Sequence, residues 1–163
     1  MLFRSFATGK VLRRFQVPFT YMTNCRLTDP EFERGVWDFL AVCNVVKTFK
    51  HTRILQMATR PFDFWSTMCN EGELLEKFNI QLSPIPLPEL TAEMKKVKAE
   101  GSEVEKVVAY CNTNMCVKIK LEELENVAAL KVAMKNLAAK YSCNAIAIQC
   151  WNALQGEIEI GRA

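Results

Sequence analysis

The clearest pattern of apolar and polar positions lies in the middle of the chain. Arg53–Met57 is a short apolar run that predicts a strand, and Pro61 predicts its end shortly before that residue. Apolar residues then recur at helical spacing, which predicts a helix over residues 68–78 that ends at Asn79. Residues 80–83 alternate and predict a second strand, closed by the prolines that follow. This order predicts a βαβ unit with parallel strands.

Long helices are predicted on both sides of this unit. The capping-box pattern of residues 28–31 predicts a helix start near Asp29, followed by one long apolar stripe. Thr91 is predicted to cap a further helix, which breaks near Gly101 and is followed by another. Residues 121–141 predict the second long helix. Its predicted buried side consists of Leu124, Val127, Ala128, Leu130, Met134, Leu137 and Ala138.

The remaining segments supply few strands. Residues 145–149 form a continuous apolar run, which is typical of a parallel strand covered on both faces. A short strand is also predicted at residues 17–22, residues 155–163 are either one short additional strand or a loose end, and residues 111–116 are rich in turn formers. Three main strands make a small sheet with an open edge, and natural domains usually pair or cover such an edge.

These elements predict an α/β fold: a small, open parallel sheet flanked by helices, Rossmann-like and incomplete, with a long N-terminal helix. Residues 1–50 are interpreted as an N-terminal arm with an interdomain amphipathic helix. Residues 51–163 are interpreted as the Rossmann-like α/β domain. The open edge suggests either a piece of a larger chain or a chain that completes itself by assembly.

Composition narrows the function classes. The chain has 163 residues, which is enough for one core, and a net charge of +3, which provides no domain-wide basic field for nucleic acid. No apolar run approaches the roughly 20 residues needed to span a bilayer. Residues 1–28 contain arginines and no acidic residue, as mitochondrial transit peptides do, but a cytoplasmic location is the favoured interpretation.

Cysteine and histidine usage argues against metal and nucleophilic chemistry. Seven cysteines, an odd number, suggest reduced thiols. Their spacing lacks the C-x2-C pattern of zinc sites, and His51 is the only histidine. His51 precedes the first strand, which places it at the wrong end of the sheet for a Cys–His pair. We therefore predict no catalytic residue and no metal ligand in this chain.

Candidate binding residues follow two predicted strands. Ligands of open parallel sheets bind beyond the carboxyl ends of the strands. A guanidinium and an amide can hold an anionic or hydroxyl-rich ligand there, and indole rings can stack on a sugar face. The alternative is that the aromatic rings complete the core and the arginine pairs with Asp63 or Glu71. The candidate contacts are Arg60, Trp65, Gln149 and Trp151.

Several short motifs follow one another along the chain. Those in the centre are the strand at residue 53, the Arg60-Pro61 loop, the Glu-bearing helix, the Lys77-Phe78-Asn79-Ile80 turn and the proline-rich exit. The others are Gly9-Lys10-Val11-Leu12-Arg13, Val17-Pro18-Phe19, Asp29-Pro30-Glu31 and residues 145–151. The order of these motifs resembles the second domain of the L-fucose and L-arabinose isomerase-like family.

The resemblance implies an aldose–ketose isomerase that uses a divalent metal, usually manganese, as a Lewis acid. No residue here matches a metal ligand of the family. The expected function is therefore a structural piece of such an isomerase, inert alone, with the remaining isomerase domains or identical subunits as partners. The alternative is a free-standing, non-catalytic module that binds a small sugar or another protein. Neither nucleic acid nor a membrane is an expected partner.

Overall fold

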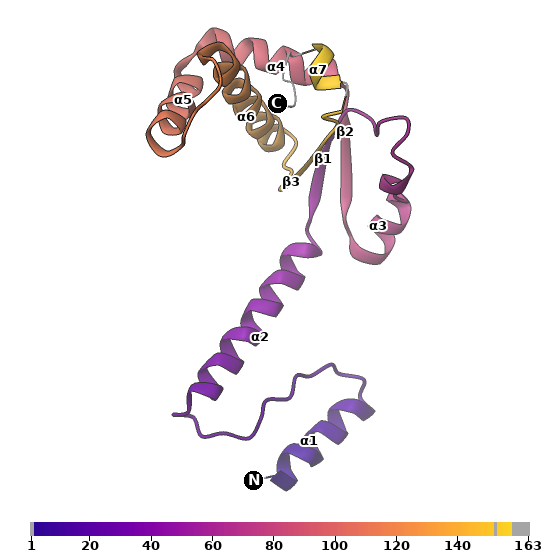
Figure 1. The fold of residues 1–163 in the computed structure, drawn as a ribbon. Helices are drawn as coiled ribbons and strands as arrows, with labels where there is room; N and C mark the ends of the chain where they lie inside the picture. The colour runs from indigo at the N-terminus through magenta and orange to yellow at the C-terminus, as the bar shows by residue number, and fades with distance from the viewer. Residues whose placement is uncertain (1, 152, 158–163) are drawn as a thin grey trace. The chain divides into compact units, whose positions relative to one another are not determined.

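The computed structural model describes residues 2–151 and 153–157, and these form two compact units (Figure 1). The first unit, Met1–Phe49, contains helix α1 (Leu2–Arg14) and helix α2 (Pro30–Phe49). The second unit, Lys50–Ala163, contains a sheet and its covering helices. The candidate binding residues all belong to the second unit.

Helix α2 begins as the sequence predicts. Pro30 occupies the first turn, where its missing N–H has no cost, and in the loop before the helix the Oδ2 atom of Asp29 accepts a hydrogen bond from the backbone N–H of Arg26 at 2.7 Å. None of the described residues of α2 is buried. The strand predicted at residues 17–22 is wrong: this segment is irregular, and no described strand pairs with it.

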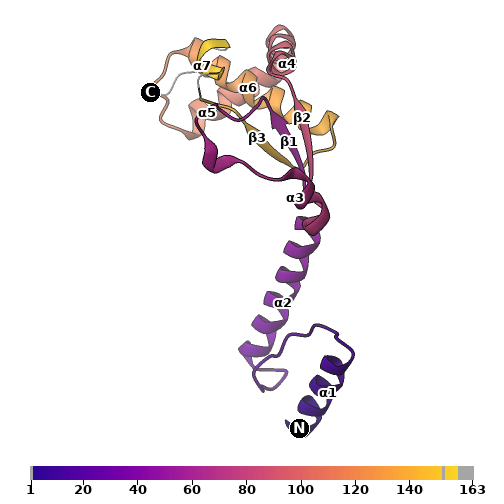
Figure 2. The same cartoon turned by 90° about the vertical axis from the view of Figure 1, so that its right-hand side faces the viewer.

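Three parallel strands form the sheet of the second unit: β1 (Arg53–Met57), β2 (Gln81–Ile85) and β3 (Ala145–Ile148), in the order β2-β1-β3. Helix α3 (Glu71–Phe78) joins β1 to β2. Helices α4 (Leu87–Glu100), α5 (Ser102–Asn114) and α6 (Leu121–Lys140) join β2 to β3. Figures 1 and 2 show these three helices together on one side of the sheet, with α3 beside the other. The predicted α/β class with a small open parallel sheet is confirmed.

The connections around α3 follow local sequence rules. The Oδ1 atom of Asn70 caps the helix by accepting from the backbone N–H of Glu73 at 3.2 Å. Asn79 ends it in the left-handed conformation, at φ 56°, which asparagine tolerates better than most residues. Met68 lies before the helix, so the predicted start at residue 68 is too early; a short 3₁₀ helix, Trp65–Thr67, precedes it instead.

Strand β2 runs further than predicted, through Pro84 to Ile85. A proline lacks the N–H that a central strand needs, but β2 lies at an edge of the sheet, so that donor is not required. Helix α4 then begins at Leu87, four residues before the predicted cap at Thr91. Pro88 fits the first turn of this helix, and the Thr91 hydroxyl donates to the Pro88 carbonyl at 3.0 Å from within it.

The core lies between the sheet and helices α4 and α6. Leu55 and Met57 on β1 are fully buried there, together with Leu90 of α4. The buried side of α6 agrees with the predicted one in part, because the predicted Leu124, Ala128 and Leu137 are buried and three more predicted residues pack against the core while partly exposed. Its buried residues are Leu124, Ala128, Ala129, Val132, Ala133 and Leu137, whereas Val127, Leu130, Met134 and Ala138 keep partial or full exposure.

Three other predictions fail in the second half of the chain. Residues 111–114 belong to α5 rather than to a turn. Strand β3 is not covered on both faces, since Ile146 and Ala147 are exposed. Residues 153–157 form the short helix α7 (Ala153–Glu157), so the strand predicted within residues 155–163 does not begin there. The rest of that predicted strand lies outside the described residues.

Candidate functional site at the carboxyl ends of β1 and β3

The next strand along the chain and the last strand lie on opposite sides of β1, which creates a switch point between β1 and β3. The chain passes from β1 to β2 on one side, and β3 returns to pair with β1 on the other side. The loops that leave β1 and β3 therefore open a crevice where open α/β sheets usually bind ligands. A cavity of about 450 Å³ lies there. Residues from β1, β3, β2, α3 and both exit loops line it, including Gln56, Arg60, Phe64, Cys69, Gln149 and Trp151.

One face of the sheet provides the apolar floor of this cavity. Ile54 and Gln56 of β1 alternate with the buried Leu55 and Met57, so their side chains lie on the opposite face from α4 and α6. Gln56 pairs in register with Ala147 of β3. The Gln56 amide donates to the Ala58 carbonyl at 3.4 Å, which leaves its side-chain oxygen as an acceptor on an otherwise apolar surface.

Backbone hydrogen bonds fix the residues that follow β1 and β3 to the neighbouring strands. Ala58 adopts a positive φ of 65° directly after β1, and its N–H donates to the Ile85 carbonyl at 2.9 Å. The Gln149 N–H donates to the Met57 carbonyl at 3.1 Å. These bonds place the Gln149 side chain, which is partly buried, in the lining of the cavity.

Arg60 contributes the only charged side chain among the residues that line the cavity. Its Nη1 atom donates to the carbonyls of Pro61 and Phe62 at 3.1 and 3.2 Å. The alternative in which Arg60 pairs with Asp63 or Glu71 is wrong for the described residues, where no ion pair of Arg60 occurs. A guanidinium has five N–H donors, so it retains donors for a ligand while it shapes its own loop.

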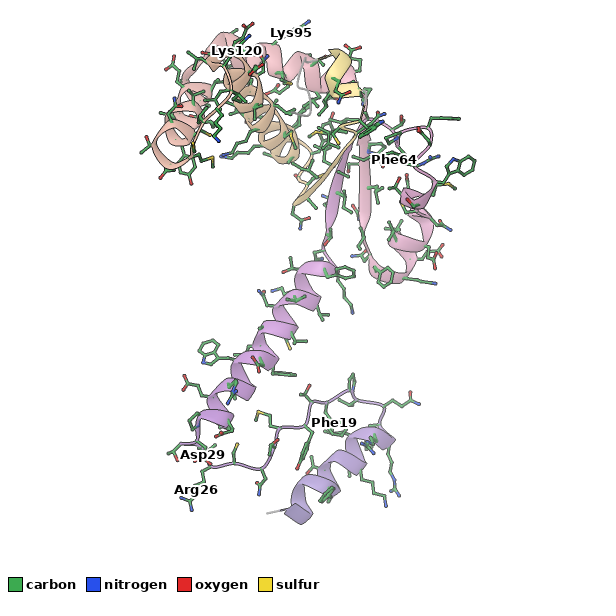
Figure 3. The ribbon with its side chains drawn as sticks, in the orientation of Figure 1. Phe19, Arg26, Asp29, Phe64, Lys95 and Lys120 are labelled. Atoms are coloured by element: carbon green, nitrogen blue, oxygen red, sulfur yellow. The ribbon has the colours of Figure 1, made fainter. Side chains whose placement is uncertain are left out.

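Aromatic side chains of the two exit loops meet at the rim. The rings of Phe64 and Trp151 have centroids 5.9 Å apart at an interplanar angle of 41°, and Figure 3 shows Phe64 on the loop that follows β1. Trp65 does not line the cavity and is 70% exposed. The structure therefore brings together Arg60, Gln149 and Trp151 of the predicted set, and leaves Trp65 apart. Asn152, which follows Trp151, lies outside the described residues.

Several lining residues were not predicted. Cys69 and Cys150 are both exposed free thiols at this cavity. Thr67 also lines it, and its hydroxyl donates to the Phe64 carbonyl at 2.9 Å, which stabilises the loop. Cys150 could have been found, since it follows Gln149 directly. Cys69 could not, because its approach depends on the path of the loop before α3.

A divalent metal of the kind implied by the family resemblance does not fit this cavity. Manganese prefers oxygen ligands such as carboxylates, and the lining residues include no carboxylate. Within the described ranges, no group of three or more His, Cys, Asp or Glu side chains could hold a metal ion. Along the same residues, no helix is both long and apolar enough to cross a bilayer.

Comparison with known proteins adds no assignment: no protein-family model matches the chain, and no curated protein matches it.

Proposed function

We propose that the second unit binds a small polyhydroxylated ligand, a sugar or sugar acid, in the cavity at the carboxyl ends of β1 and β3. In this proposal it serves as a non-catalytic part of an aldose–ketose isomerase-like protein. The convergence of two exit loops on one cavity at the switch point carries the proposal. The isomerase context rests on the resemblance of the motifs between Gly9 and Trp151 alone.

The chemistry of the lining residues suits such a ligand. Hydroxyl groups both donate and accept, and the amides of Gln56 and Gln149 do the same. Arg60 supplies positive charge for a carboxylate or for electron-rich hydroxyls. The indole of Trp151 presents an apolar face against which the C–H groups of a sugar ring can pack. The cavity volume lies within the range of small-molecule sites.

Protection of cysteines from alkylation tests the proposal. The full chain is treated with iodoacetamide, with and without L-fucose, and alkylation of each cysteine is followed by peptide mass spectrometry. Ligand in the cavity should slow the alkylation of Cys69 and Cys150 in a saturable manner. Cys116 is also exposed but does not line the cavity, so its rate should not change.

Matched variants locate the effect. Trp151→Ala should abolish protection, whereas Trp65→Ala should preserve it, because only Trp151 lines the cavity. The non-catalytic part of the proposal is tested separately by measuring ketose formation from L-fucose with added manganese. Protection without turnover supports the proposal. Equal alkylation rates with and without sugar would refute sugar binding, and turnover by the isolated chain would refute the non-catalytic assignment.

A further inference from the structure

The two edges of the sheet differ in how they are protected. On β2, the Gln81 N–H donates to the Thr52 carbonyl and the Ile85 carbonyl accepts from Ala58, so the odd-numbered residues turn their backbone groups toward β1. Pro84 therefore faces the free edge, where its missing N–H leaves a neighbouring strand without a donor. Proline at an edge is a common protection against pairing.

Strand β3 has no such protection. The Gln149 N–H donates to Met57 of β1, so strand alternation turns the backbone N–H and C=O groups of Ile146 and Ile148 toward the other edge. Among the described residues, no strand lies on that side. The sequence Ala-Ile-Ala-Ile contains neither charge nor proline, and an edge of this kind is a template for another strand.

An apolar groove of about 770 Å³ runs beside this edge, between β3 and α6. Ile146 lies on the same face of the sheet as Leu55, yet it is 38% exposed whereas Leu55 is fully buried. Val127 of α6 is 42% exposed in the same groove. Part of the predicted buried side of α6 is therefore exposed in this groove.

The charges beside the groove indicate what would cover it. Its lining residues include two charged side chains, Lys131 and Lys135, and no acidic one. A second copy of the chain, paired through β3, would bring the same lysines toward each other across the symmetry axis, and like charges disfavour that contact. A segment with carboxylates would complement them.

We infer that the β3 edge and the adjoining groove bind an extended, acidic–apolar segment of a partner protein. The segment pairs its backbone with Ile146 and Ile148 and covers the exposed apolar side chains of β3 and α6. Its carboxylates lie near Lys131 and Lys135. Backbone pairing provides the affinity and the lysines provide the selectivity, as in other interactions that add a strand to a sheet. This surface differs from the cavity at the ends of the strands, with which it shares only Ile148.

Fluorescence anisotropy with the full chain tests the inference. The probe is a short synthetic peptide of alternating valine and threonine with glutamates at both ends, and the matched control peptide carries lysines instead. The acidic peptide should bind at least about tenfold more tightly than the basic one, and added salt should reduce the difference.

Variants of the chain separate backbone pairing from charge. Ile146→Pro removes one outward donor, as Pro84 does on β2, and should weaken binding about tenfold. If circular dichroism shows that this variant does not fold, Ile146→Lys places a charge on the edge instead. Reversal of both groove lysines to glutamate should invert the peptide preference. Reversal of Lys95 and Lys96 on α4, of which Lys95 is labelled in Figure 3, should not.

Equal binding of the two peptides to all variants would overturn the inference, as would an absence of binding. Self-association that Ile146→Pro abolishes would also overturn it, because the second copy would then be the occupant.

Discussion

Removal of one hydroxyl group, in Tyr141→Phe, should lower the free energy of unfolding by about 1 kcal/mol at neutral pH. The Tyr141 hydroxyl donates to the Oε1 atom of Glu89 at 2.6 Å, and the Lys140 Nζ donates to the same atom at 2.7 Å. These bonds join the end of α6 to the start of α4. A bond to a charged group contributes about 1.5–3 kcal/mol when buried, but Glu89 retains solvent contact and keeps Lys140, which reduces the loss.

The effect should depend on pH in a defined direction. The hydrogen bond from Lys140, followed by that from Tyr141, lowers the pKa of Glu89 below its ordinary value of 4.5. A carboxyl group with a lowered folded-state pKa stabilises the protein above its unfolded-state pKa, and this contribution is lost as the pH falls through the folded-state value. The difference between wild type and Tyr141→Phe should therefore be full at neutral pH and shrink once the pH falls below 4.5.

Urea unfolding, followed by far-UV circular dichroism, measures this difference at neutral pH and at a pH below 4.5. Tyr110→Phe is the matched control, since Tyr110 is exposed and its hydroxyl has no hydrogen-bond partner among the described residues. It should leave the midpoint unchanged. A stability loss for Tyr141→Phe that stays constant from neutral to acidic pH would refute the assignment of the bond to ionised Glu89.

Other substitutions test the βαβ unit. Asn79→Ala should destabilise the protein by about 1–2 kcal/mol, because alanine tolerates a positive φ poorly and the hydrogen bond from the Asn79 amide to the Lys50 carbonyl, 2.8 Å long, is lost. Asn79→Gly tolerates the same backbone conformation and should lose less stability. The midpoints of urea unfolding distinguish the two variants. Leu55→Ala should lower the free energy of unfolding by about 3 kcal/mol, because Leu55 is fully buried in the central strand, whereas Leu75→Ala on α3 should lower it by less than about 1 kcal/mol. Thermal unfolding measures both losses. Equal losses for the two variants would contradict the described core.

The periodicity of the apolar residues predicted which helices and strands form better than it predicted the residues at which they begin and end. The strand at Arg53–Met57 and the helix at residues 121–140 were correctly predicted, because each has a long or well-bounded apolar pattern. The start of α4 was missed because Thr91 is a good cap in isolation, while Pro88 is equally suited to a first turn. Local propensity alone does not decide between two acceptable starts.

The buried side of α6 was predicted only in part from its apolar residues. Alanines occur around the helix, so more than one stripe is apolar, and packing against α4, α5 and the sheet also buries Ala129 and Ala133. The same limit applies to the site. That Arg60, Gln149 and Trp151 share one cavity follows from the sheet order, whereas the position of Trp65 depends on the path of an irregular loop.

Titration of the ¹⁵N-labelled full chain with L-fucose tests the proposed binding site most directly. The chain has three tryptophans, Trp37, Trp65 and Trp151, and each gives one indole N–H signal. Because only Trp151 lines the cavity, its signal should shift in a saturable manner while those of Trp37 and Trp65 stay in place. Three unchanged signals, or three that move together, would contradict sugar binding at the ends of β1 and β3.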